Sequence, residues 1–156
     1  MDSILLTNSL GYVGRGTVHG IYTAGSYLVN GAHAEISSRI EALDIVNKVK
    51  VVDAFLEDAT RGGPGCEGGC HHRPLRVALQ SVSEVVERVH TLLESIKHEC
   101  ALHEQRYFHY WRTPDCMEQL NALENTSVIL DQRLALALQI SAQDARSSGA
   151  HRLKME

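Results

Sequence analysis

The chain has 156 residues with 44% hydrophobic and 22% charged side chains, which is the composition of one folded domain and not of a disordered segment. Fifteen Lys and Arg against nineteen Asp and Glu give a net charge of −4, and the two signs are interspersed along the chain. This distribution offers no basic surface for nucleic acid or anionic membrane, so we expect no nucleic-acid partner. Three prolines and an aromatic content of 5% favour helix over sheet.

Residues 1–15 form an N-terminal arm whose pattern fits either a strand-like or an irregular conformation. The arm carries Asp2 where a signal peptide needs basic residues, and the apolar run that follows is too short, so secretion by that route is not expected. The longest stretch without Asp, Glu, Lys or Arg, residues 16–34, contains four glycines and is a poor membrane span. We therefore expect an intracellular protein, cytoplasmic or within a larger particle, without a transmembrane segment.

A first helix is predicted over residues 17–60, with a kink near residue 30 where Gly31 interrupts the pattern. Its apolar residues recur mostly at spacings of three and four, the period of a helix that buries one face. These residues are Val18, Ile21, Leu28, Ile36, Ile40, Leu43, Ile45, Val49, Val52 and Leu56. On the first part of this helix, Gly16, Gly20 and Ala24 form a row of small residues that permits close backbone approach, so we expect a contact surface there.

A glycine-rich loop follows over residues 61–73, where six positions are Gly or Pro. It also contains four residues with the ligand types and close spacing of a zinc knuckle, namely Cys66, Cys70, His71 and His72. The following helix carries a Cys and a His on its seam, at Cys100 and His103, about 39 Å from Pro74 at 1.5 Å per residue, too far to complete the site. The loop must therefore supply all four zinc ligands or share the metal between two chains. The alternative is a solvated loop whose cysteines are close by chance.

The second predicted helix, over residues 74–111, has the most regular pattern in the chain. Its core-facing positions alternate spacings of four and three without interruption, as in a coiled-coil heptad. This seam comprises Leu75, Leu79, Val82, Val86, Val89, Leu93, Ile96, Cys100, His103, Tyr107 and Tyr110. Ala78, Val85 and Leu92 widen the first half of the seam, so that half is expected to contact more than one partner helix.

A third helix is predicted over residues 115–146, with Thr113 as its N-cap and Pro114 in its first turn. The heptad spacing recurs in Cys116, Leu120, Leu123, Ser127, Leu130, Leu134, Ala137 and Ser141. Short connections imply antiparallel neighbours, so the predicted fold is all-α, an up-down-up bundle of three long helices. The bundle forms one domain, residues 16–146, and residues 147–156 form a flexible tail.

Antiparallel folding about the glycine-rich loop places His33 beside Cys100 and His103, which share the seam of the second helix. Folding across the second turn brings Glu124 to the same level. As one hypothesis, this buried polar cluster binds a metal or changes its protonation. The alternative is a core histidine with one hydrogen-bond partner, beside a cysteine that acts as a small hydrophobe.

Half of the eight aromatic residues gather at the end of the second helix, as Tyr107, Phe108, Tyr110 and Trp111. In one interpretation they close that end of the bundle. Because consecutive side chains on a helix point in different directions, some of them must also project outward. Exposed Trp and Tyr side chains are typical of the energetic centre of a protein interface, so we predict a contact surface here.

The chain contains no motif for nucleophilic catalysis, no phosphate-binding glycine loop and no Cys-x-x-Cys redox pair. We therefore do not expect an enzyme. Heptad-patterned helices without such motifs are typical of a non-catalytic scaffold, adaptor or structural subunit of a larger assembly, whose partner is another protein or a second copy of the chain. The alternative hypothesis is a zinc-binding module that uses the Cys/His-rich loop 66–72.

Overall fold

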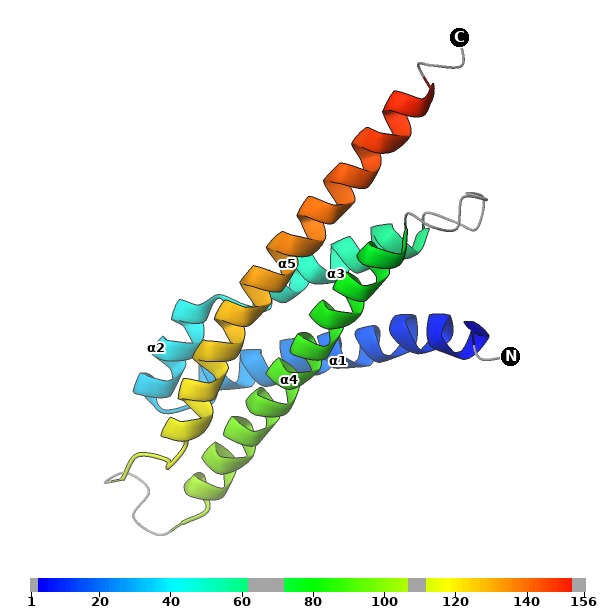
Figure 1. Cartoon of the computed structure of the whole chain (residues 1–156). Coiled ribbons are helices and arrows are strands. Elements are labelled where there is room, and N and C mark those ends of the chain that lie inside the picture. The colour runs from blue at the N-terminus through cyan, green and yellow to red at the C-terminus, as the bar shows by residue number, and fades with distance from the viewer. Residues whose placement is uncertain (1–2, 62–71, 107–111, 153–156) are drawn as a thin grey trace.

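The computed structural model describes residues 3–61, 72–106 and 112–152, and within these ranges the chain forms helices and no strand (Figure 1). The helices are α1 (Ser3–Gly31), α2 (Ala34–Leu43), α3 (Ile45–Arg61), α4 (His72–Glu104) and α5 (Met117–Arg152). The all-α prediction is confirmed. The segment left open as an N-terminal arm is helical from Ser3 onward, because α1 begins there.

The predicted first helix is three helices, because the chain reverses between α1 and α2. After the reversal α3 lies antiparallel to α1, with the ammonium group of Lys50 6.0 Å from the centre of the Tyr22 ring. Further along the pair, a Cβ on Gly25 would lie 3.0 Å from Val46 Cγ2. The predicted kink near residue 30 is therefore a full turn of the chain. The predicted three-helix up-down-up bundle is not confirmed: α2 and α3 pack against both α1 and α5, and α4 packs between α1 and α5.

A second break separates α2 from α3 at Asp44. Asp44 has φ 50° and ψ 32°, the left-handed conformation that ends a helix, and its N–H donates to the Glu41 carbonyl at 3.1 Å. Asp tolerates this conformation better than most residues because its side chain can bond locally. Here the Asp44 carboxylate accepts a hydrogen bond from Asn47 Nδ2 at 2.6 Å.

Helices α4 and α5 form an antiparallel hairpin, in which Arg133 Nη1 donates to the Ser81 carbonyl at 2.9 Å. α4 ends at Glu104, short of the predicted residue 111, and residues 107–111 lie outside the described ranges. α5 starts at Met117, later than the predicted residue 115, because the Cys116 N–H bonds to the Pro114 carbonyl in a tight turn. α5 also continues to Arg152, beyond the predicted end at residue 146.

The seam of the second predicted helix forms the centre of the core. Its members from Val82 to Cys100 are buried, and Leu75 and Leu79 are half-buried. α1 and α5 contact α4 from different sides, so the widened seam does have more than one partner helix. Burial of each such aliphatic side chain contributes about 1.5–3 kcal/mol to folding.

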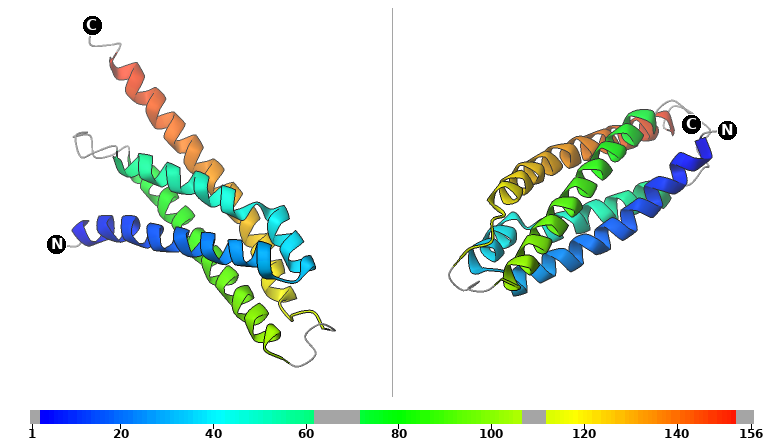
Figure 2. Two further views of the ribbon diagram at one scale, coloured as in Figure 1. Left: turned by 180° about the vertical axis from the view of Figure 1, so that it is seen from behind. Right: turned by 90° about the horizontal axis from the view of Figure 1, so that it is seen from below.

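Two basic side chains hold α2 and α3 against α5. Arg39 on α2 donates to Glu124 Oε1 from Nε at 2.9 Å and from Nη2 at 2.6 Å. On α3, Lys48 Nζ donates to Ser127 Oγ at 2.9 Å and to Asp131 Oδ2 at 2.7 Å. These contacts lie on the first half of α5. The last turns of α5 project past the ends of α3 and α4 (Figures 1 and 2).

Candidate functional site

The chemistry at the closed end of the α4–α5 hairpin centres on two cysteines. Cys100 and Cys116 are 2% and 0% exposed, both are free thiols, and their side chains hydrogen-bond to each other. Burial first, and then the neighbouring Cys116 and Glu104, raise the pKa of Cys100 to about 12. Burial also raises the pKa of Cys116. Both thiols therefore stay protonated at neutral pH and are poor nucleophiles.

Tyr27 of α1 completes this end of the bundle. Its hydroxyl hydrogen-bonds with Glu104 in the last turn of α4. Burial first, and then the nearby Glu104 and Cys100, raise the pKa of Tyr27. The contact joins the end of α1 to the end of α4, which suits a structural role.

The predicted cluster of His33 with Cys100 and His103 does not form. His33 is exposed at the N-cap of α2, because the chain reversal between α1 and α2 turns this residue out of the core. His103 is half-buried in the last turn of α4, and Glu124 pairs with Arg39. The prediction assumed that the first and second helices run antiparallel. In the structure α1 and α4 run in the same direction, because Gly20 lies against His90 and Tyr27, further along α1, contacts Glu104, further along α4.

The contact between Cys100 and Cys116 was missed, although the sequence carries a signal for it. Both cysteines occupy heptad positions, and each lies eight residues from residue 108, close to the middle of the turn between the helices. An antiparallel hairpin about that point brings the two residues level.

The predicted zinc ligands Cys66, Cys70 and His71 lie outside the described residues, as do the predicted interface aromatics at residues 107–111. His72 is the first residue of α4. Within the described ranges, no three His, Cys, Asp or Glu side chains are grouped so that they could hold a metal ion. Zinc binding by the loop and protein binding by the aromatic cluster both stay predictions.

The row of small residues on α1 is largely occupied within the chain itself. Ala24 is buried in the core, and Gly20 packs against His90 of α4, where an added Cβ would lie 2.2 Å from His90 Nε2. Gly16 is exposed, with open space around its Cβ position. The expected close approach is therefore real, but its partner at Gly20 is an imidazole ring of the same chain.

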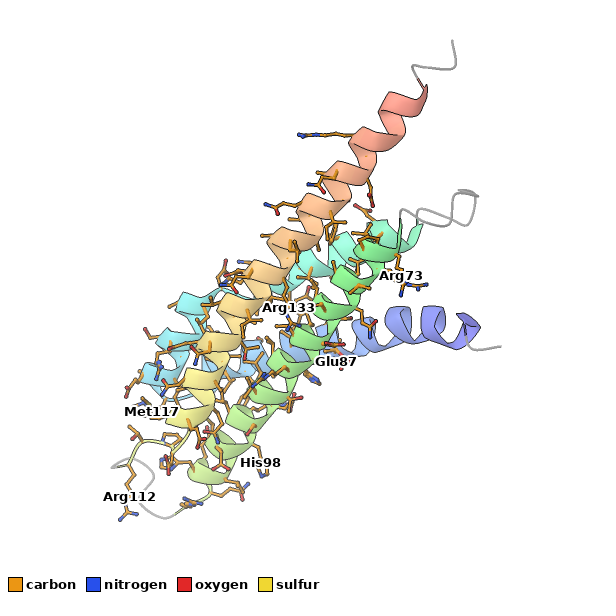
Figure 3. All side chains as sticks on the ribbon, in the orientation of Figure 1. Arg73, Glu87, His98, Arg112, Met117 and Arg133 are labelled. Atoms are coloured by element: carbon orange, nitrogen blue, oxygen red, sulfur yellow. The ribbon has the colours of Figure 1, made fainter. Side chains whose placement is uncertain are left out.

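A surface better suited to a partner lies along the hairpin of α4 and α5, on the side where a shallow hollow separates the two helices. The hollow has a volume of about 200 Å³ and is lined by Glu84, Val85, Arg88, Thr126, Ile129 and Arg133. Arg133 lies between the two helices (Figure 3). We call this side the outer α4–α5 face.

The outer α4–α5 face continues toward the open end of the bundle through two large apolar residues. Val77 is 60% exposed and lies two turns from Glu84, and Leu136 is 54% exposed and lies two turns from Ile129. Residues seven apart share a face of a helix, so Val77 and Leu136 lie on the same side of the α4–α5 hairpin as the hollow. The hydrogen bond from Arg133 to the Ser81 carbonyl shows that these two residues face each other across the hairpin. Leu136 lies about one turn after Arg133 and Val77 about one turn before Ser81, so these two residues are level with each other.

One stretch in the second half of α5 is apolar on more than one side. From residue 134 to residue 140 it reads Leu-Ala-Leu-Ala-Leu-Gln-Ile. Leu136 and Leu138 are 54% and 45% exposed, and two residues correspond to about 200° around a helix, so they project in opposite directions. Large apolar residues are therefore exposed on two sides of this stretch.

Comparison with protein-family models, with curated proteins and with solved structures found no match to this chain. In the part of the chain that the structure describes, no helix combines the length and the apolar character needed to cross a membrane. The candidate site is accordingly defined by its own residues, as the outer α4–α5 face and the adjoining second half of α5.

Proposed function

We propose that this protein is a non-catalytic helical scaffold, adaptor or structural subunit, which works by binding another protein surface through the second half of α5 and the outer α4–α5 face. The observation that carries the proposal is the exposure of Leu136 and Leu138 on opposite sides of α5. Water contact on two apolar sides of one helix is unfavourable, and a protein partner would remove it.

Two further observations support a protein partner over a small-molecule ligand. Two hollows in the described part of the chain have volumes of about 120 and 200 Å³, while ligand pockets usually hold about 300–1,000 Å³. The buried thiols at the closed end of the hairpin are also held protonated, so they favour packing over chemistry.

Site-specific photo-crosslinking in cells tests the proposal. A benzophenone amino acid replaces Leu136 or Leu138 in the full chain, and Glu118 serves as the control because it is exposed in the first turn of the same helix. We expect crosslinks to protein at residues 136 and 138 and none at 118. Absence of crosslinks at 136 and 138, or equal labelling at all three positions, would show that this part of α5 binds no protein.

A further inference from the structure

The exposed side of α4 carries charges of opposite sign in a symmetric order. Arg73, Arg76, Gln80, Glu84 and Glu87 are all exposed and are spaced by three or four residues, so they share one face of the helix. Arg73 and Glu87 extend from α4 on the side away from α5 (Figure 3). None of the four charged side chains forms an ion pair with another described residue.

The order of these charges is self-complementary about Gln80. Arg76 and Glu84 lie four residues on either side of it, and Arg73 and Glu87 lie seven residues on either side. If a second α4 packs antiparallel with Gln80 opposite Gln80, each Arg meets a Glu of the other copy, four times in all. Such symmetry is what a two-fold interface requires, because one surface must complement itself.

One exposed apolar residue lies near the same two-fold axis. Val77 is 60% exposed and lies three residues from Gln80, so each copy places it close to the axis and inside the charged pairs. An apolar centre within a charged rim is the usual anatomy of a protein interface.

We propose that a second copy of this chain is a partner, and that its α4 packs antiparallel against the exposed charged side of α4 with Gln80 at the two-fold axis. The inference rests on the proposed function and adds a second contact surface, beside the outer α4–α5 face, with its partner named. Charge complementarity selects a second copy here, because an unrelated partner gives no reason for the arrangement to be symmetric.

Charge-swap variants test the proposal by sedimentation equilibrium over a concentration series. The full wild-type chain is expected to form a reversible dimer of twice its 17.2 kDa mass. Arg76→Glu places Glu opposite Glu84 at two symmetric positions, and Glu84→Arg places Arg opposite Arg76. Each single variant is expected to raise the dissociation constant of its own dimer by about tenfold or more.

The decisive sample is an equimolar mixture of the Arg76→Glu and Glu84→Arg chains. In a mixed dimer every swapped position again meets the opposite charge, so we expect a heterodimer with close to wild-type affinity, and the same recovery in the double variant. Glu41→Arg, an exposed charge reversal on α2, is the control and should leave the dimer unchanged. Circular dichroism verifies that all variants are folded.

A monomeric wild type at every concentration overturns the inference, and so does a dimer that the single variants leave unaffected or that mixing does not recover. A monomer that still forms crosslinks to another protein at Leu136 would leave the proposed function intact and remove only the second copy as partner. A monomer without any such crosslink would contradict both.

Discussion

At the scale of single residues, the two buried thiols illustrate how a structural cysteine pair differs from a reactive one. Cys100 and Cys116 have the contact of a redox pair, but burial raises the pKa of each thiol and removes the thiolate that reactivity needs. The pair therefore acts as a small apolar contact that joins α4 to the start of α5.

The raised pKa of Cys100 predicts a dependence of stability on alkaline pH. The thiol has an ordinary pKa of 9.0 and a folded-state pKa of about 12. Below pH 9 both the folded and the unfolded chain keep the proton, so the contribution of Cys100 to stability is constant. Between these two pKa values only the unfolded chain releases it, so rising pH favours unfolding by up to about 1.4 kcal/mol for each pH unit.

Urea unfolding at a series of pH values compares wild type with Cys100→Ala. The variant loses packing at all pH values, but its free energy of unfolding should fall less steeply from pH 9 upward. Removal of Cys100 also removes its hydrogen bond to Cys116 and its effect on Tyr27, so the difference in slope reports Cys100 together with its coupling to these two groups. Identical slopes would mean that Cys100 titrates normally in the folded chain.

At the scale of the helices, the heptad pattern predicted α4 and its buried seam because such a pattern depends only on local spacing. It did not predict the reversal between α1 and α2. No proline marks that turn, and the apolar spacing continues almost in phase across it, so local spacing alone reads as one helix. The break at Asp44 was missed for a related reason, since an Asp in the left-handed conformation has no strong sequence signal.

The missed chain reversal between α1 and α2 also affected the prediction of the candidate sites. His33 was placed in the core by an antiparallel pairing of the first and second predicted helices, and the reversal invalidates that pairing. The outer α4–α5 face was not predicted at all. Its apolar members Val77 and Leu136 lie off the seam, and their exposure depends on which helices cover which sides.

The crossing of α1 over α4 yields a prediction with a matched control on the same helix. Gly20→Ala would place a Cβ against the His90 ring and is expected to lower the free energy of unfolding by about 1–3 kcal/mol. Gly16→Ala meets open space in an exposed helical position and is expected to raise it by about 0.5–1 kcal/mol.

Thermal and urea unfolding of both variants measure this difference, and a double-mutant cycle with His90→Ala identifies its cause. Removal of the imidazole should recover most of the Gly20→Ala loss, because the two changes share one contact. Equal effects of the two glycine substitutions would mean that α1 does not approach α4 at Gly20.

At the scale of the whole molecule, the core contacts of the described helices are concentrated in the region where all of these helices meet. The open end of the bundle, opposite the turn between α4 and α5, is less covered. α5 leaves that core with Leu136 and Leu138 exposed, and α4 begins beside it with Val77 exposed. A partner on these surfaces would extend the apolar core beyond the chain, which links the fold to the proposed scaffold function.

The mass of the protein as it exists in its own cells tests this account most directly. Native mass spectrometry or sedimentation of gently isolated material should detect a particle larger than the single 17.2 kDa chain. Replacing Leu136 and Leu138 with Asp should reduce that particle to the single chain without unfolding it. A stable 17.2 kDa monomer, with a melting temperature that is independent of concentration, would contradict the account.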